Sequence, residues 1–196
     1  MDRAGASEFK TIAKRSLAIF DLDGTLIRSD SFRTLVVQNF VRHPNLIVAA
    51  ALRAAHMMNR KRFAEICHAG ISERLSDVSY LTGILDRLER DVSAEVAAIL
   101  RRHLDASERV VLISASPNQY VAPFAERMGF SAGYGSDWRN GKYNHLYGEA
   151  KLEFVTNLFP KSDFDWCFGI SDSQSDRALL EACKAYQYWD GSLSNA

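Results

Sequence analysis

The sequence predicts an α/β fold, with a parallel sheet covered by helices and an all-helical insert after the first strand. Two observations predict the sheet: short apolar runs end in loop residues, and helical patterns alternate with them along the chain. A third observation predicts the insert, because residues 31–104 show helical spacing and little strand signal.

Four apolar runs are expected to form strands, at residues 16–23, 109–116, 164–171 and 185–189. The first three are nearly continuous apolar segments, as expected for strands that are buried on both faces. Helices are expected at residues 119–128 and 176–183. Pro123 weakens the first of these helices unless it falls within the opening turn.

The insert separates two parts of the predicted core. Helical spacing relates Phe32, Leu35, Val36 and Phe40 at its start, and Val92, Val96, Ile99 and Leu100 at its end. We therefore expect a Rossmann-like catalytic core at residues 1–30 and 105–196 and a helical cap at 31–104. The Asn140-Gly141 pair predicts a small hairpin around residues 138–143.

Composition excludes several classes of protein. Lys plus Arg equals Asp plus Glu, at 24 each, so no basic excess points to nucleic acid. Cys67, Cys167 and Cys183 are far apart, which disfavours a disulfide framework or a zinc site and fits a reducing compartment. The N-terminus is polar, and the longest apolar run, residues 46–52, is too short to cross a bilayer. We therefore expect a cytoplasmic protein without a membrane span.

Reactive side chains gather where the predicted strands end. Asp21 and Asp23 end the first strand, Ser114 and Ser116 the second, and Asp172 and Asp176 follow the third. Lys151 lies in a helix-like stretch upstream of the third strand. Parallel sheets bind ligands outside the carboxyl ends of their strands. These groups are therefore expected to meet at one edge.

Such a cluster requires cations. Carboxylates that converge on a phosphate repel one another by about 4 kcal/mol per pair at about 4 Å and an effective dielectric constant of roughly 20. Oxygen ligands select a hard ion, and Mg²⁺ suits a site that also holds a substrate phosphate. With Lys151 as a second positive charge, the set is suited to phosphoryl transfer to an aspartate.

These residues resemble the four ordered motifs of the haloacid dehalogenase superfamily. The motifs are Asp21-Leu-Asp23-Gly-Thr25-Leu26, Ser114, Lys151 and Ser171-Asp172-Ser-Gln-Ser-Asp176, and the likeness spans about residues 16–190. The insert after the first motif and the Ser114-Ala-Ser-Pro117 tetrad resemble the phosphoserine-phosphatase-like branch. Many relatives have Gly-Asp where this chain has Ser171-Asp172, which puts the geometry of that loop in question.

The resemblance implies a role for each residue. Asp21 would be the nucleophile, Asp23 the general acid and base, and Thr25 would orient Asp23. Ser114 and Lys151 would bind the phosphate. Mg²⁺ would be bound by Asp21, Asp172 and the backbone carbonyl of Asp23, with Asp176 as support. Since the true dehalogenases of the family lack an aspartate at the position of Asp23, the resemblance implies a phosphatase acting on a small phosphate ester.

Each residue also has a simpler interpretation. Asp21 and Asp23 are typical turn residues before Gly24, and Asp172 is suited to capping the helix that follows. Ser114 and Lys151 have ordinary structural roles of their own, as a strand-end hydroxyl and a solvated helix charge. Only their joint order and placement favour a catalytic site. The sequence also contains no GxxxxGK[ST] or GxSxG motif, which disfavours P-loop nucleotidases and serine hydrolases.

The substrate is not readable from the sequence. Asp30 occupies a position where the resembled branch carries an acid that faces the substrate, but it is equally suited to capping a helix at Ser31. The basic run Arg60-Lys61-Arg62 is either a solvated helix face or a site for a charged or lipid-like molecule. Two other functions stay open: a phosphotransferase, and a phosphate-binding or regulatory module without turnover. The oligomeric state is not predicted.

Overall fold

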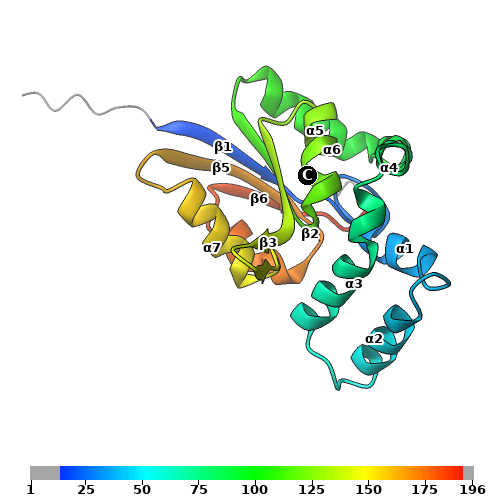
Figure 1. Cartoon of the computed structure of the whole chain (residues 1–196). Coiled ribbons are helices and arrows are strands. Elements are labelled where there is room, and N and C mark those ends of the chain that lie inside the picture. The colour runs from blue at the N-terminus through cyan, green and yellow to red at the C-terminus, as the bar shows by residue number, and fades with distance from the viewer. Residues whose placement is uncertain (1–13, 192–196) are drawn as a thin grey trace, which may run out of the picture.

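The computed structural model describes residues 14–191 and confirms the predicted α/β fold (Figure 1). Six strands form one sheet in the order β4-β3-β2-β1-β5-β6, with β3–β4 antiparallel and the other pairs parallel. The strands are β1 (Arg15–Phe20), β2 (Arg109–Pro117), β3 (Ala132–Arg139), β4 (Lys142–Asn144), β5 (Phe164–Ser171) and β6 (Ala185–Tyr188). The polar N-terminus considered above lies outside the described residues.

Eight α-helices and one 3₁₀ turn connect these strands within the described chain. Five helices lie between β1 and β2: α1 (Ser31–Gln38), α2 (Pro44–Ala54), α3 (Arg60–Leu75), α4 (Val78–Arg90) and α5 (Ala94–Asp105). The others are α6 (Asn118–Arg127), α7 (Glu149–Leu158) and α8 (Arg177–Glu181), the last preceded by the 3₁₀ turn Gln174–Asp176. No helix of this described part is long and apolar enough to span a membrane.

Alternating side chains of the central strands divide the core into two layers. Phe20 and Leu112 face one side of the sheet, where they pack in a cluster with residues of α5 and α6. Ile19 and Val111 face the other side and pack with residues of α7 and α8. Burial on both faces explains why these strands are continuous apolar runs.

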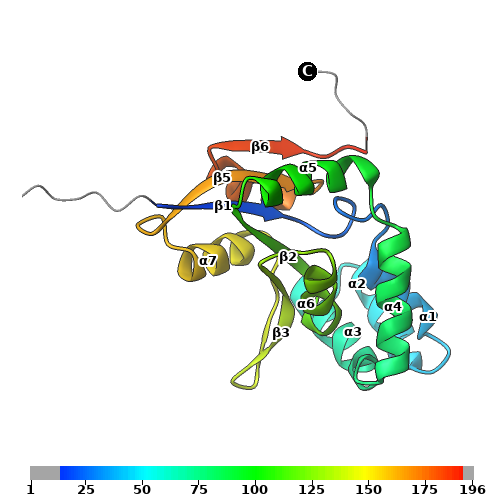
Figure 2. The same cartoon turned by 90° about the horizontal axis from the view of Figure 1, so that it is seen from above.

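The helices inserted after β1 form the cap (Figures 1 and 2). Helices α1 to α4 extend beyond the end of the sheet, whereas α5 lies over β1 and β5 (Figure 2). His103 of α5 accordingly stacks on Phe168 of β5 at 4.5 Å between ring centroids. The last helix of the insert thus also covers the sheet, and the core and cap boundaries drawn from sequence stay predictions.

Some predicted bounds need correction. The first strand ends at Phe20 rather than at residue 23, because the chain from Asp21 onward turns away into a loop. Pro123 lies inside α6, beyond its opening turn, and the helix continues past it. The hairpin is present, with Asn140 and Gly141 at φ 50° and 74° as a tight turn of this kind requires.

Candidate active site

The candidate active site lies where the strand order reverses. From β1 the chain builds the sheet toward β2 in one direction and toward β5 in the other, so the crevice between β1 and β5 is a ligand-binding position of this architecture. Asp21 follows β1, and its backbone N–H donates to the Ile170 carbonyl of β5 at 3.0 Å. The loop after β5 carries Asp172 and Asp176, which brings the first and last motifs together.

A buried ion pair network joins Asp21 to α7. The Lys151 ammonium is 3% exposed and donates to Asp21 Oδ1 at 2.8 Å and to Asp176 Oδ2 at 2.5 Å. Ser171 Oγ also donates to Asp176 Oδ2, at 2.8 Å. The serine that replaces the usual glycine therefore supports Asp176. Lys151 is accordingly a buried partner of two carboxylates and not a solvated helix charge.

Burial and charge oppose each other in this network. Burial raises the pKa of Asp21 to about 7, although the Lys151 ammonium acts to lower it. Burial would lower the pKa of Lys151, but the carboxylates of Asp21 and Asp176 raise it above its ordinary value. Lys151 therefore stays charged at neutral pH, while Asp21 needs more positive charge nearby to be fully ionised.

Thr25 connects Asp21 to Asp172. Its hydroxyl accepts from the backbone N–H of Asp172 at 2.8 Å and lies 3.4 Å from both Asp21 Oδ2 and Asp172 Oδ1. Gly24 has φ 73°, and a Cβ there would come within 2.2 Å of Asp172 Oδ2. A side chain at Gly24 would therefore displace the Asp172 carboxylate, which lies directly against this loop.

The donor set between Asp21 and Asp172 fits a hard cation. Two carboxylates approach the same hydroxyl, and Lys151 contacts only the Oδ1 side of Asp21. Among residues 14–191, no lysine, arginine or histidine forms an ion pair with Asp172. Oxygen ligands of this kind suit Mg²⁺, whose charge would offset the repulsion between the two acids.

Asp23 points away from this network, toward the cap. Oδ1 of Asp23 accepts from the backbone N–H and the hydroxyl of Ser31, at 2.6 and 2.5 Å. Oδ2 accepts from Ser116 at 2.5 Å and from Ser114 at 3.3 Å. Burial raises the pKa of Asp23, and the hydrogen bonds from Ser116 and Ser31 partly offset that rise.

Ser31 was not among the site residues predicted from sequence, and Ser116 was expected at this edge of the sheet but was given no role of its own. Ser31 is the first residue of α1, so Asp23 occupies a helix N-terminus where backbone N–H groups favour an anion. Asp30 caps the same helix by accepting from the Arg33 N–H at 2.8 Å. The Asp30 side chain therefore caps α1, as the simpler interpretation expected, and Ser31 at the start of this helix is hydrogen-bonded to Asp23.

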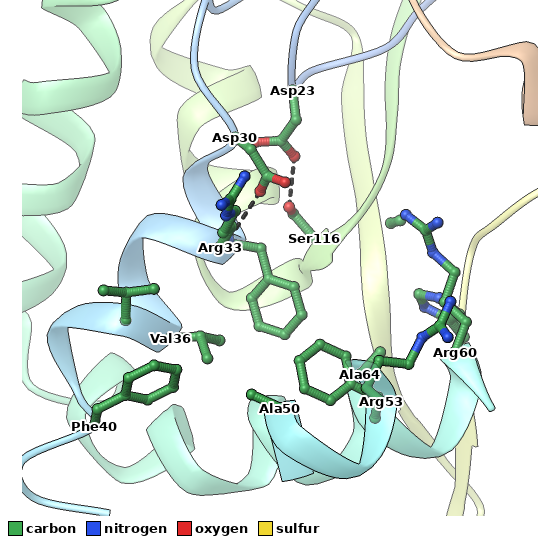
Figure 3. A pocket seen from close by; sticks show the side chains of 15 residues that line it. Asp23, Asp30, Arg33, Val36, Phe40, Ala50, Arg53, Arg60, Ala64 and Ser116 are labelled. Atoms are coloured by element: carbon green, nitrogen blue, oxygen red, sulfur yellow. Dashed lines mark hydrogen bonds between the residues drawn. The ribbon is translucent and has the colours of Figure 1, made fainter. Parts of the chain in front are cut away.

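A cavity of about 490 Å³ lies beside Asp23, between the core and α1, α2 and α3 (Figure 3). Asp23, Asp30 and Ser116 lie at one end of it (Figure 3). Its cap wall is apolar and aromatic, formed by Phe32, Val36, Val37, Phe40, Phe63 and Ala64. Arg33, Arg53, Arg60 and His145 add polar groups to the lining. Asp30 therefore both caps α1 and faces this chamber.

Several known proteins with similar sequences are named as hydrolases or phosphatases. The profile of the haloacid dehalogenase-like hydrolase family matches residues 18–181. A probable phosphatase of Mycobacterium tuberculosis is 28% identical over 86% of this chain and 66% of its own length. A phosphoserine phosphatase of the same organism is 23% identical over 90% of this chain and 65% of its length. The chain thus spans slightly less than two thirds of these relatives.

Solved structures agree on the fold. A phosphoserine phosphatase, captured as an analogue of its phospho-aspartyl intermediate, superposes with a TM-score of 0.54 and 13% identity. The match covers 89% of this chain and 86% of that one. At this identity the likeness concerns the fold alone.

Proposed function

Since the chain belongs to the haloacid dehalogenase-like hydrolases, in the phosphoserine-phosphatase-like branch, we propose that it is a magnesium-dependent phosphomonoester hydrolase with Asp21 as its nucleophile. One observation carries the proposal. Asp21 has one oxygen bound by the buried Lys151, while its other oxygen approaches Asp172 across Thr25. Asp21 therefore lies between Lys151 and the position proposed for Mg²⁺, and attack on a phosphate dianion requires such positive charge.

In the proposed reaction, Asp21 attacks phosphorus and the bond to the leaving-group oxygen breaks. Asp23 protonates that oxygen and later deprotonates the water that releases phosphate from Asp21. The raised pKa of Asp23 favours holding the proton, and its position beside the cavity is where a leaving group would lie. Lys151 neutralises the Asp21 carboxylate and the phosphate.

Mg²⁺ would be held by the carboxylates of Asp21 and Asp172 and the backbone carbonyl of Asp23. When bound, it supplies the charge that lets phosphate and carboxylates share the site. Thr25 and the absence of a side chain at Gly24 keep Asp172 in place. Asp176 contacts Lys151 and positions its ammonium group.

The cavity is proposed to receive the leaving group. The groups after β1 and β5 contact only a phosphoryl group, so selection among esters falls to the chamber beside Asp23. Its apolar cap wall and its three arginines suit a leaving group with an apolar part and additional negative charge. This lining is a poor match for a small zwitterion alone.

Turnover of p-nitrophenyl phosphate by purified protein tests the proposal. Activity should require Mg²⁺, disappear with EDTA and return on addition of the metal. Asp21→Asn should abolish it while the fold, followed by circular dichroism, stays intact. Full activity of Asp21→Asn or of metal-free protein would refute the assignment, and phosphoryl transfer to an added alcohol in preference to water would favour the phosphotransferase alternative.

A further inference from the structure

The end of the cap carries an unusual concentration of exposed apolar side chains. Nine large hydrophobic residues are exposed among residues 14–191, and five of them lie between Val37 and Met57. The five are Val37, Val41, Ile47, Val48 and Met57, with exposed fractions of 50% or more, and of these Val37 is also part of the cavity wall. In Figure 1 this segment, which includes α2, forms the part of the cap most distant from β6. A clustered apolar surface of this kind marks an interaction site more often than isolated hydrophobic residues do.

Helix α2 shows how this surface arises. Its inward side chains Leu46 and Ala49 are buried, and α2 packs against α3. Its outward face follows helical spacing through Pro44, Ile47, Val48 and Ala51, and all four are exposed. A solvated helix face is normally polar, and a helix that is apolar all round is normally buried. The outer face of α2 therefore has the composition of a face with a partner.

The charge around this apolar face has one sign. From residue 31 to residue 64 the chain contains six arginines or lysines and no aspartate or glutamate, although its overall formal charge is zero. Arg42, Lys61 and Arg62 belong to the same segment as the apolar residues and are exposed. Arg62 is partly neutralised by Glu65 at 2.9 Å, which leaves Arg42 and Lys61 as the cations to test.

We propose that this cap-end surface, residues 37–62, docks on an anionic lipid bilayer. Ile47, Val48 and Met57 would enter the interfacial region, and Arg42 and Lys61 would contact lipid headgroups. Exposed apolar side chains on a short helix, ringed by cations, are the features that hold a protein at the surface of an acidic membrane. The docked helices are those that wall the cavity, so the chamber would open close to the bilayer.

Charge argues against two other occupants. A symmetric dimer through α2 would place the same cationic segment of two copies face to face, with no acid in residues 31–64 to pair with it. A nucleic acid backbone would satisfy the cations but would leave the apolar side chains of α2 in water. The bilayer interface accommodates both.

Vesicle sedimentation with the full chain tests the proposal. The protein should pellet with phosphatidylcholine vesicles that contain about one third phosphatidylglycerol, and stay in solution with phosphatidylcholine alone. Salt near 1 M should reduce binding, because it screens the headgroup charge. Arg42→Glu with Lys61→Glu should lower the partition coefficient at least about tenfold. Ile47→Ser with Val48→Ser should do the same at unchanged charge.

Matched variants control for charge and hydrophobicity. Arg102→Glu with Lys142→Glu changes the net charge equally, at exposed positions outside the cap end, and Val78→Ser removes an exposed apolar group from α4. Both should bind like wild type. None of the substituted residues lines the cavity or contacts the proposed catalytic groups, so p-nitrophenyl phosphate turnover should be retained by all of them.

Four results would overturn the proposal. The first is equal binding to neutral and anionic vesicles, or none. The second is equal loss in the control variants. The third is a dimer, measured by light scattering, that disappears in Ile47→Ser/Val48→Ser while vesicle binding is absent, since that would identify a second copy as the partner. Binding of an oligonucleotide without vesicle binding would likewise contradict it.

Discussion

Replacing Lys151 with methionine removes the cation that contacts both buried acids, Asp21 and Asp176, while keeping most of the side-chain volume. In the wild type, Lys151 lies 2.8 Å from Asp21 and 2.5 Å from Asp176 and is almost fully buried. Removing one partner of a buried ion pair typically costs about 3–5 kcal/mol, because a charge is left without compensation. We expect a loss of this size in the free energy of unfolding of Lys151→Met at pH 8.

The loss of stability in Lys151→Met should be larger at higher pH. Burial already raises the pKa of Asp21 to about 7, and the loss of Lys151 raises it further. The folded variant therefore binds a proton that the unfolded chain releases near pH 4, so its stability falls as the pH rises. The limit for one group is about 1.4 kcal/mol per pH unit. Because Asp21 has a pKa of about 7 in the wild type as well, the two proteins respond differently only above pH 7, and the loss near pH 5 should be about 1 kcal/mol smaller than at pH 8.

Urea denaturation between pH 5 and pH 8 measures this effect, with wild type run at each pH. Lys184→Met is a matched control, because Lys184 forms an exposed pair with Asp165 at 2.5 Å. Exposed pairs contribute about 0–1 kcal/mol, so that variant should stay close to wild type at every pH. A Lys151→Met protein that matches wild type at pH 8, or whose deficit does not grow with pH, would refute the account of this network.

Three further predictions concern neighbouring residues. Asp23→Asn should reduce turnover of alkyl phosphates at least about tenfold more than that of p-nitrophenyl phosphate, because only poor leaving groups need the proton; equal losses would argue against a general acid. Gly24→Ala should lower the free energy of unfolding, measured by urea denaturation, by about 1 kcal/mol, because Gly24 has a positive φ. It should also weaken activation by Mg²⁺ several-fold, because the added Cβ displaces Asp172. An unchanged Mg²⁺ titration would contradict this. Burial lowers the pKa of His145 to about 4, with Arg60 as a further cause, so this residue should contribute a loss of stability as the pH falls from 6.5 toward 4. Over this pH range, His145→Asn should lose about 2 kcal/mol less stability than the wild type, as measured by thermal denaturation. Parallel pH profiles of the two proteins would exclude this contribution from His145.

The strands that carry the site were predictable because their chemistry is local. A buried parallel strand is a continuous apolar run, and the residues after it fall at the carboxyl edge of the sheet. Strand β3 gave no comparable signal. It contains Gly133 and Gly135, where a Cβ would come within 2.5 Å of Ala125 Cβ and 2.4 Å of the Ser116 carbonyl. Close approach of α6 and β2 excludes the side chains that identify a strand.

The surroundings of Asp23 were not predictable for a different reason. Ser31 is eight residues away and Ser116 is 93 residues away, and their approach depends on how the loop after β1 turns into α1. Ser114 and Ser116 share a strand end, and the sequence does not reveal which hydroxyl makes the shorter contact. The exposure of α2 was also not predictable, because it depends on tertiary packing. From sequence alone, an apolar run such as residues 46–52 is expected to be buried.

A phosphoryl group on Asp21 is the central claim, and trapping it during turnover is the most direct test. Protein acid-quenched with substrate and Mg²⁺ should gain one phosphoryl group, which peptide mass spectrometry should place on Asp21 and hydroxylamine should remove. Asp23→Asn should form the same adduct with p-nitrophenyl phosphate and lose it more slowly, because water lacks its base. Active enzyme with no adduct under these conditions, or with the phosphoryl group on another residue, would contradict the mechanism.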